Sequence, residues 1–192
     1  RYTYGFAYGA PWAAIAGGAL LLGALFTRQR QSPFKGAPTV WLFLLAIWIT
    51  ISWLNGIDSD NDYALWDKVM KVYLMVFVTL ALLSNKQHIM IYTWVAVGSI
   101  ALLAIKGGIY TVSTGGGHRV WGPTGSFIED NNHFALATLM IIPMLHFLQL
   151  QLEKGWQRHL LSVSMLLCVA SALGSHSRGA LLAMVAMGAV FW

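Results

Sequence analysis

The sequence predicts an all-α, polytopic integral membrane protein, a helical bundle of about seven transmembrane segments. Of its 192 residues, 57% are hydrophobic and only 10% are charged, and the mean hydropathy is +0.62. A soluble domain has about 25% charged residues. The apolar residues also occur in runs close to the roughly 20 residues that a helix needs to cross a bilayer. Composition and run length together argue against an ordinary soluble domain.

Each predicted span is an apolar run with aromatic or charged residues near its ends. The runs cover residues 7–26, 39–54, 63–83, 89–105, 134–152 and 160–174, and a seventh starts at residue 179. Tryptophan and tyrosine lie near these ends, as in the aromatic belts of membrane proteins, at Tyr8, Trp12, Trp41, Trp53, Trp66, Tyr110, Trp121 and Trp156. The chain begins with Arg1 and stops inside an apolar run. We therefore expect residues 1–192 to be a single transmembrane domain within a longer protein.

The connections between the spans fall on two sides of the membrane. Each side carries six Lys and Arg residues, so the positive-inside rule does not orient the chain. The acids are unequal: connections 27–38, 84–88 and 153–159 hold only Glu153, whereas the other side holds Asp58, Asp60, Asp62, Asp67, Glu129 and Asp130. The first side has short, basic loops. We predict that it is cytoplasmic and that the second side is outside.

One long polar segment interrupts the apolar sequence at residues 111–133, on the predicted outer side. Its glycines leave the backbone free to fold back, and it holds His118, Arg119, Asp130, Asn131, Asn132 and His133. A second, very short connection lies at residues 175–179 on the same side. Loops carry function more often than the elements they join, so we predict a functional loop at 111–133. The alternative is a solvated surface loop.

Two arginines on this side suit an anionic ligand. The planar guanidinium of Arg119 or Arg178 matches two oxygens of a phosphate, and Arg178 opens the seventh span, where backbone N–H groups also favour an anion. The isoelectric point is near 9.5, and in a membrane protein we interpret the cations as membrane-flanking residues or as ligands of acidic lipid, and not as a nucleic-acid site. Asp130, Asn131 and Asn132 have an alternative role as caps of the fifth helix.

Two lysines lie at or just inside the predicted membrane boundary. Ionisable groups at this depth are functional candidates by default, and Lys71 is one turn into the third span while Lys106 ends the fourth. Each has a structural alternative. Lys71 stands four residues after Asp67 and could pair with it, and Lys106 could extend its ammonium group to the surface.

The histidines of the outer side are candidate general bases, although a loop histidine is often structural. They are His118, His133 and His176. With Glu129 and Asp130 they could also supply zinc ligands, but no HExxH or cysteine pattern supports a metal site. Walker, GxSxG and dinucleotide motifs are likewise missing from the sequence. We therefore expect neither a metal nor a nucleotide cofactor.

Two motifs resemble the bacterial O-antigen ligase and polymerase superfamily. They are Trp-Gly-Pro-Thr-Gly-Ser-Phe-Ile-Glu-Asp-Asn-Asn-His-Phe-Ala-Leu at residues 121–136 and Ser-His-Ser-Arg-Gly-Ala-Leu-Leu-Ala at residues 175–183. The opening Arg-Tyr-Thr-Tyr-Gly-Phe-Ala-Tyr-Gly-Ala-Pro-Trp-Ala and the Trp-Asp-Lys-Val-Met-Lys at residues 66–71 are similar, more narrowly, to the O-glycosylation ligase branch of lipopolysaccharide O-antigen ligases. The resemblance runs through the whole chain.

The resemblance implies a multi-pass glycosyltransferase of the bacterial inner membrane with a periplasmic active side. Its partners would be an undecaprenyl-diphosphate-linked glycan as donor, a lipid A–core acceptor and membrane lipid. By the family's pattern Arg119 and Arg178 would hold the diphosphate and stabilise the leaving group. We expect further substrate contacts from His118, Asp130, Asn131, Asn132, His133 and Lys71.

The chain departs from the superfamily at its C-terminal end. Members carry a larger periplasmic loop beyond the seventh span, with a histidine thought to be the base, whereas this sequence stops at Trp192. We therefore expect the general-base histidine to lie outside the chain.

Other functions remain open at this point. An O-antigen polymerase or a protein O-glycosylation ligase would use the same kind of donor, and the motifs do not separate them from a ligase. A membrane transporter could line a midplane site with helices broken at Gly107, Gly108 and residues 115–117. An assembly subunit without chemistry is a further alternative.

Overall fold

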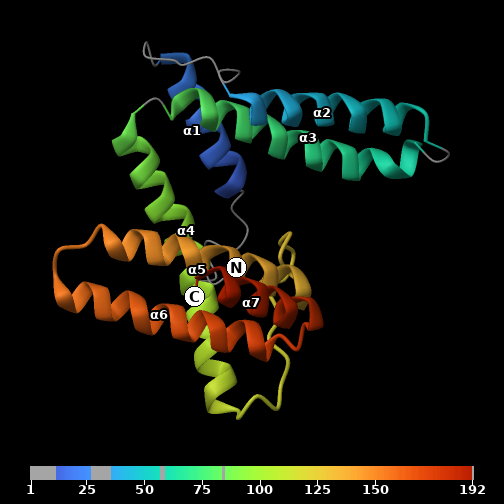
Figure 1. Ribbon diagram of the computed structural model, residues 1–192. Coiled ribbons are helices and arrows are strands. Elements are labelled where there is room, and N and C mark those ends of the chain that lie inside the picture. Colours follow the sequence, from blue (N-terminus) through green and yellow to red (C-terminus); the bar gives the residue numbers. More distant parts are fainter. Residues whose placement is uncertain (1–11, 27–35, 57–58, 84, 192) are drawn as a thin grey trace. The chain divides into compact units, whose positions relative to one another are not determined.

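The computed structural model describes residues 12–26, 36–56, 59–83 and 85–191, and within these ranges its regular structure is entirely helical. The helices are α1 (Trp12–Phe26), α2 (Ala37–Leu54), α3 (Ser59–Leu82), α4 (Lys86–Ser113), α5 (Asn131–Leu150), α6 (Gly155–Gly174) and α7 (Arg178–Phe191) (Figure 1). The all-α prediction is confirmed for this part of the chain. Residues 7–11 of the first predicted span and most of connection 27–38 lie outside the described residues.

Each predicted span corresponds to one helix, with shifts at the ends. The fourth run of apolar residues stops at residue 105, but α4 continues to Ser113 because a helix needs backbone hydrogen bonds and not apolar side chains. The fifth helix begins at Asn131, three residues before the predicted span. The helices thus enter both ends of the predicted 111–133 loop, which leaves residues 114–130 between α4 and α5, and the turn between α6 and α7 comprises residues 175–177.

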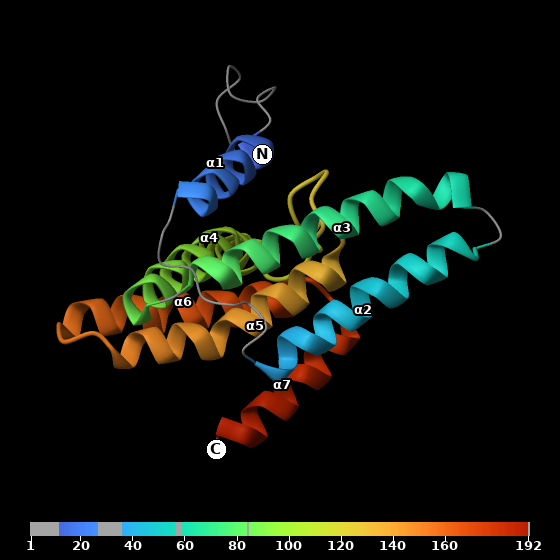
Figure 2. The same cartoon turned by 90° about the horizontal axis from the view of Figure 1, so that it is seen from above.

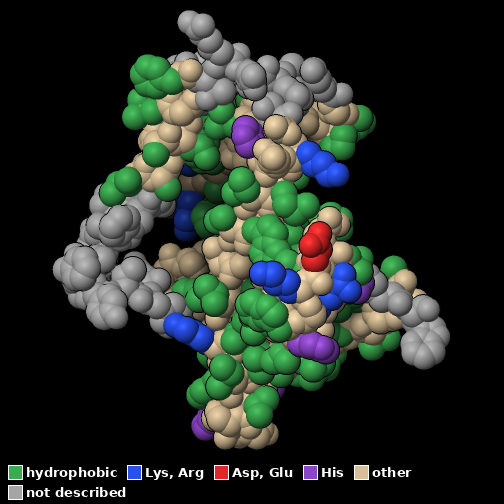
Figure 3. Space-filling model, turned by 90° about the vertical axis from the view of Figure 1, so that its left-hand side faces the viewer, with side chains coloured by type: hydrophobic (Ala, Val, Ile, Leu, Met, Phe, Trp, Pro, Cys, Tyr) green, Lys and Arg blue, Asp and Glu red, His purple; other side chains and the backbone are tan. Residues whose placement is uncertain are grey.

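Three helices of the described chain, α2, α4 and α5, are long and apolar enough to cross a membrane. The remaining helices do not meet both requirements, so a bundle of seven spans stays a prediction. Helix α2 has a mean hydropathy of 1.8, yet only 6% of its residues are buried inside the protein. Hydrophobic side chains also cover much of the surface seen in Figure 3, with few charged groups between them. Surfaces of this kind suit lipid better than water.

The chain divides into two compact units, described separately here. In the first, Thr3–Ile89, helices α2 and α3 form an antiparallel hairpin, and α1 also packs on α3 (Figure 2). Aromatic side chains join the hairpin along its length: the rings of Phe43 and Phe77 meet edge to face at 6.1 Å, and Trp53 stacks on Trp66 at 4.6 Å. Compactness does not decide membrane insertion. The prediction of a single transmembrane domain over 1–192 therefore stays open.

The second unit, Met90–Trp192, contains the polar loop between α4 and α5. Helices α5 and α6 form an antiparallel hairpin, and α4 and α7 pack against it (Figure 1). Two clusters of buried residues make the core: Val97, Ala101, Ala104, Ile141, Leu145, Leu148 and Cys168 where α4 meets the hairpin, and Ala135, Leu139, Ala172 and Ala180 where α7 meets it. The alanines keep the helix axes close, as in membrane bundles.

Helices α4 and α6 cross so closely that their contact requires glycine. A Cβ atom at Gly108 would collide with the backbone carbonyl oxygen of Leu167, and one at Gly174 would collide with the side chain of Thr111. Glycine therefore permits this approach. Helix α4 is nevertheless unbroken from Lys86 to Ser113. The transporter alternative needs a helix broken at Gly107 and Gly108, and this break is not present. Instead, both glycines allow neighbouring residues to pack closely against α4.

The crossing predicts opposite effects for two glycine substitutions in the same helix. Gly108→Ala forces the α4 and α6 backbones apart, and overpacking of this kind costs about 1–3 kcal/mol. Gly98→Ala, also in α4, has no atom within 4 Å of the added Cβ, and it should be neutral or gain up to about 1 kcal/mol from helix propensity. Thermal unfolding in detergent measures both. Equal Tm values for the two variants would contradict the close crossing.

Candidate functional site

Hydrogen bonds join the polar loop to the turn between α6 and α7. After α4 the chain reverses at Gly115 and Gly116, which have φ values of +63° and +76°. The buried Val120 then donates its N–H to the carbonyl of Gly174 at 2.9 Å. The ring of His176 lies 3.0 Å from the carbonyl oxygen of Gly116, measured at Nε2. The two polar connections singled out in the sequence are therefore parts of one structure.

The segment between Gly122 and Glu129 closes on itself. The N–H of Gly122 donates to the carbonyl of Glu129 at 3.0 Å, and the N–H of Gly125 donates to its carboxylate, at Oε2, at 2.7 Å. A Cβ at Gly122 would collide with the carbonyl of Ile128, so this closure requires glycine there. Glu129 thus closes the loop through both its main-chain carbonyl and its side chain.

The start of α5 gives its three polar residues different positions. Asp130 is the N-cap, and its carboxylate accepts a hydrogen bond from the N–H of Asn132 at 2.8 Å. This bond is the main reason that the pKa of Asp130 lies below its usual value. Asn131 is buried and donates from Nδ2 to the carbonyl of Ser175 at 2.8 Å. The capping alternative is confirmed for Asp130, and Asn131 fastens the start of α5 to the turn.

The turn itself is short and tightly bonded. His176 has a φ of +54°, a left-handed conformation that is uncommon outside glycine. The buried Ser177 accepts a hydrogen bond at Oγ from the N–H of Ala180, which caps the first turn of α7. Arg178 is the first residue of that helix, as predicted, and it is exposed. A rigid turn therefore sets the position of the Arg178 backbone.

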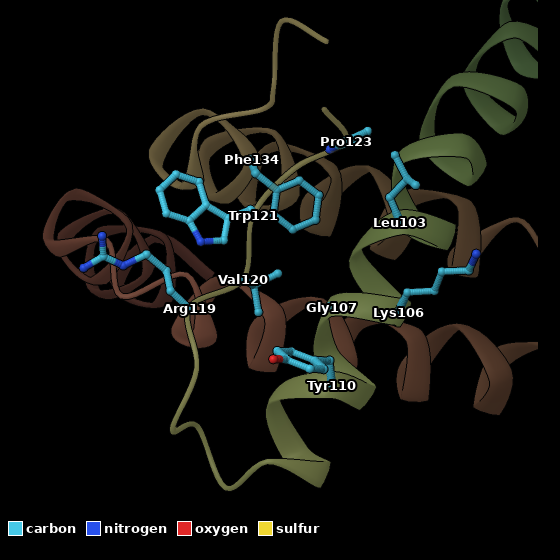
Figure 4. Close-up of a pocket in the computed structure, with 9 residues that line it drawn as sticks. All are labelled: Leu103, Lys106, Gly107, Tyr110, Arg119, Val120, Trp121, Pro123 and Phe134. Atoms are coloured by element: carbon cyan, nitrogen blue, oxygen red, sulfur yellow. The ribbon is translucent and has the colours of Figure 1, made fainter. Parts of the chain in front are cut away.

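A pocket of about 360 Å³ lies between α4, the polar loop and α5. Its lining comprises Leu103, Lys106, Gly107, Tyr110, Arg119, Val120, Trp121, Pro123 and Phe134. Figure 4 shows Lys106 and Arg119 at opposite edges, with aromatic rings between them. The guanidinium carbon of Arg119 is 5.9 Å from the centre of the Trp121 ring, within reach of a cation–π interaction. The pocket thus combines two cations with aromatic surface.

The predicted site residues separate into groups. The exposed His118, Asn132 and His133 surround the loop, and the His118 ring lies 6.4 Å from that of Tyr110. Lys71 belongs to the other unit, where its ammonium group pairs with Asp67 at 2.5 Å, as its structural alternative predicted.

Sequence reasoning missed part of the lining of this pocket. Tyr110 was interpreted only as a membrane-interface residue, and Trp121 and Phe134, although both belong to the 121–136 motif, were given no role in ligand binding. Lys106 and Tyr110 are four residues apart and therefore lie on the same face of a helix. This spacing is the sequence feature that could have predicted that both line one pocket.

The candidate zinc ligands do not assemble. Among the described residues, which include His118, Glu129, Asp130, His133 and His176, no three His, Cys, Asp or Glu side chains form a group that could hold a metal ion.

The position of Asn131 predicts a structural role that the neighbouring Asn132 lacks. Asn131→Ala leaves the buried carbonyl of Ser175 without its donor, and such a loss costs about 1–3 kcal/mol. Asn132→Ala removes an exposed side chain at the next position and should change stability little. The Tm of each variant in detergent measures the difference. Similar Tm values would contradict the role of Asn131 in holding the turn.

Comparison with known proteins identifies a family for this chain. No curated protein and no solved structure is similar enough to this chain to count as a match. Residues 1–153 match a family, and these residues include α1 to α5 and the whole polar loop. The chain belongs to this family, which is described as a family of unknown function (DUF5935).

Proposed function

We propose that the protein is a membrane glycosyltransferase that moves a glycan from an undecaprenyl-diphosphate carrier to lipid A–core, an O-antigen ligase. The main support is the arrangement of the two arginines. Arg119 precedes Val120, which is bonded to Gly174, and Arg178 follows the turn that Asn131 holds. Both arginines therefore stand at the same end of the α5–α6 hairpin. A diphosphate held by both arginines would therefore bind at this end of the hairpin.

The electrostatics of this end favour an anionic ligand. Glu129 and Asp130 are the nearby acids, and backbone N–H groups already bond both carboxylates. Among the described residues, no ion pair joins an acid to Arg119 or Arg178. No described acid thus neutralises either guanidinium group. A diphosphate offers several oxygens in the geometry that two guanidinium groups match.

The proposed reaction forms one bond and breaks another. A hydroxyl oxygen of the acceptor attacks the anomeric carbon of the donor, the bond from that carbon to the carrier's phosphate oxygen breaks, and a base takes the hydroxyl proton. Arg119 and Arg178 stabilise the charge that develops on the departing diphosphate. The carrier is already an activated leaving group, so the reaction needs neither a metal nor a nucleotide.

Sugar rings of the donor fit the aromatic part of the pocket. Tyr110 and Trp121 are both exposed and line it beside Arg119. A glycan attached to the diphosphate would extend from the cations along these rings. His118, Asn132 and His133 are exposed around the loop and can donate or accept hydrogen bonds from sugar hydroxyls.

The alternatives differ from this proposal in defined ways. An O-antigen polymerase or a protein O-glycosylation ligase would use the same arginines with another acceptor. A membrane transporter is less well supported, because α4 is continuous and the cations lie at the end of the hairpin instead of mid-span.

In the inner membrane of a bacterium, the proposal places the polar loop and the 175–177 turn on the periplasmic side. In this proposal α5 and α6 both cross the membrane, so the loop before α5 and the turn after α6 lie on the same side.

The proposal predicts that transfer depends on both arginines. Arg119→Ala and Arg178→Ala should each lower transfer by about 100-fold or more, the usual effect of removing a group that stabilises transition-state charge. Arg119→Lys should recover little of the lost transfer activity, because an ammonium group cannot bind two phosphate oxygens with a planar pair of N–H donors. The assay uses the full-length protein in membranes with an undecaprenyl-diphosphate glycan and lipid A–core. A chelator should not change the rate.

The matched control is Lys154→Ala, an exposed cation at the N-cap of α6, the opposite end of the hairpin. It should transfer like the unmodified protein. Full activity of both arginine variants would refute the diphosphate site. Extension of the donor glycan without transfer to lipid A–core would instead establish the polymerase.

The proposed orientation predicts accessibility to a thiol reagent that does not cross membranes. A cysteine at the exposed Thr124 in the polar loop should react from the periplasm, whereas one at Glu153 between α5 and α6 should not. The native Cys168 is fully buried and should contribute little background. Labelling of intact spheroplasts gives the result, and the reverse pattern would invert the orientation.

A further inference from the structure

A second pocket, of about 420 Å³, lies in the α2–α3 hairpin, where α2 ends and α3 begins. It contains three tryptophans and one acid: Trp48, Trp53, Trp66 and Asp62, with Ile49, Ser52, Gly56, Leu65 and Val69 completing the lining. Trp48 is 67% exposed, so the indole is accessible from outside the protein. The proposed transfer reaction uses none of these residues.

Contacts between the rings hold the aromatic wall in place. The rings of Trp53 and Trp66 stack at 4.6 Å with an interplanar angle of 20°, and Tyr63 lies 5.9 Å from each of them. The indole N–H of Trp66 donates to the Oγ1 of Thr50 at 3.3 Å. A site built from residues that are already oriented loses less entropy when a ligand binds.

The carboxylate of Asp62 lies at this wall and is exposed. Its Oδ2 is 4.0 Å from the position that a Cβ at Gly56 would take. Within the described part of the chain, no hydrogen bond or ion pair engages this carboxylate. Asp67, the next acid along the helix, differs because it pairs with Lys71. The pocket therefore presents a negative charge that is not paired with any cation of the described residues.

We propose that this pocket binds an organic ammonium group. The face of an indole ring is negative and attracts cations, and tryptophan is the strongest of the aromatic residues in this respect. Aromatic faces suit a large, weakly hydrated cation, whereas Ca²⁺ or Mg²⁺ would need several oxygen ligands and the pocket supplies one carboxylate. Asp62 is the counter-ion, and the indole rings contact the alkyl groups.

The position of the pocket indicates where such a group would come from. Helix α2 is long and apolar enough to cross a membrane, and the pocket lies at its C-terminal end. In a membrane that α2 spans, this end would lie at the level of the lipid headgroups, where tryptophan is enriched. The ammonium group of a phospholipid and that of a soluble amine share the chemistry the pocket recognises. This inference stands independently of the transfer reaction proposed above.

The test is ¹⁹F NMR of the full-length protein with 5-fluorotryptophan in detergent, titrated with choline. Trp48→Phe, Trp53→Phe and Trp66→Phe assign the three resonances. Choline should shift them saturably, and its uncharged analogue 3,3-dimethylbutan-1-ol should bind at least about fivefold more weakly, since cation–π attraction requires charge. Equal binding of the two compounds would overturn the proposal.

Asp62→Asn keeps the shape of the side chain and removes its charge. The Asp62→Asn substitution should weaken choline binding by about fivefold or more. Without choline, the three tryptophan resonances of this variant should keep their positions, which would show that the pocket is intact. The matched control is Asp67→Asn, which alters a neighbouring acid that does not line the pocket, and it should bind choline normally. Unchanged affinity in Asp62→Asn, or equal losses in both variants, would overturn the proposal.

Lipid composition then distinguishes the two sources. In nanodiscs of phosphatidylcholine, a headgroup in the pocket would place the resonances at their choline-bound positions before any choline is added. In nanodiscs of phosphatidylglycerol they would stay at the free positions until choline is added. Identical spectra in both lipids, with a response to added choline alone, would assign the pocket to a soluble amine.

Discussion

The close crossing of α4 and α6 is the constraint on which the arrangement of the second unit depends. Gly108 and Gly174 lie where a side chain would collide with the opposite helix, so the two backbones come nearly into contact. This brings the end of α4 and the end of α6 to the same place. Val120 can then reach the carbonyl of Gly174, and the polar loop cannot move independently of the turn that follows α6.

At this end of the second unit, the acidic side chains and the arginines have different kinds of partner. The loop acids are bonded by backbone N–H groups, whereas Arg119 lies against an indole ring and Arg178 is exposed at a helix start. A carboxylate that accepts backbone hydrogen bonds is a weaker partner for a nearby guanidinium group. Among the described residues the two guanidinium groups thus have no acidic partner, although the loop contains acids and bases in similar number.

The polar residues of the motif Glu-Asp-Asn-Asn-His have distinct tasks despite their adjacency. Glu129 closes the loop, Asp130 caps α5 and Asn131 holds the turn, which leaves Asn132 and His133 exposed. A helix start explains this division, because successive residues there point in directions about 100° apart. The motif thus has a structural role in the loop and in the turn before Arg178, and it leaves two polar side chains exposed beside them.

The sequence by itself determined the helical class, the approximate position of every helix and the place of the polar loop. Apolar runs, their polar interruptions and capping residues are local signals, and a helix is a local structure. It could not show that Val120 meets Gly174, that Asn131 meets Ser175 or that Tyr110 and Phe134 line one pocket. These contacts join residues that are distant in the chain. Only the tertiary structure decided them, because they depend on how closely the helices pack.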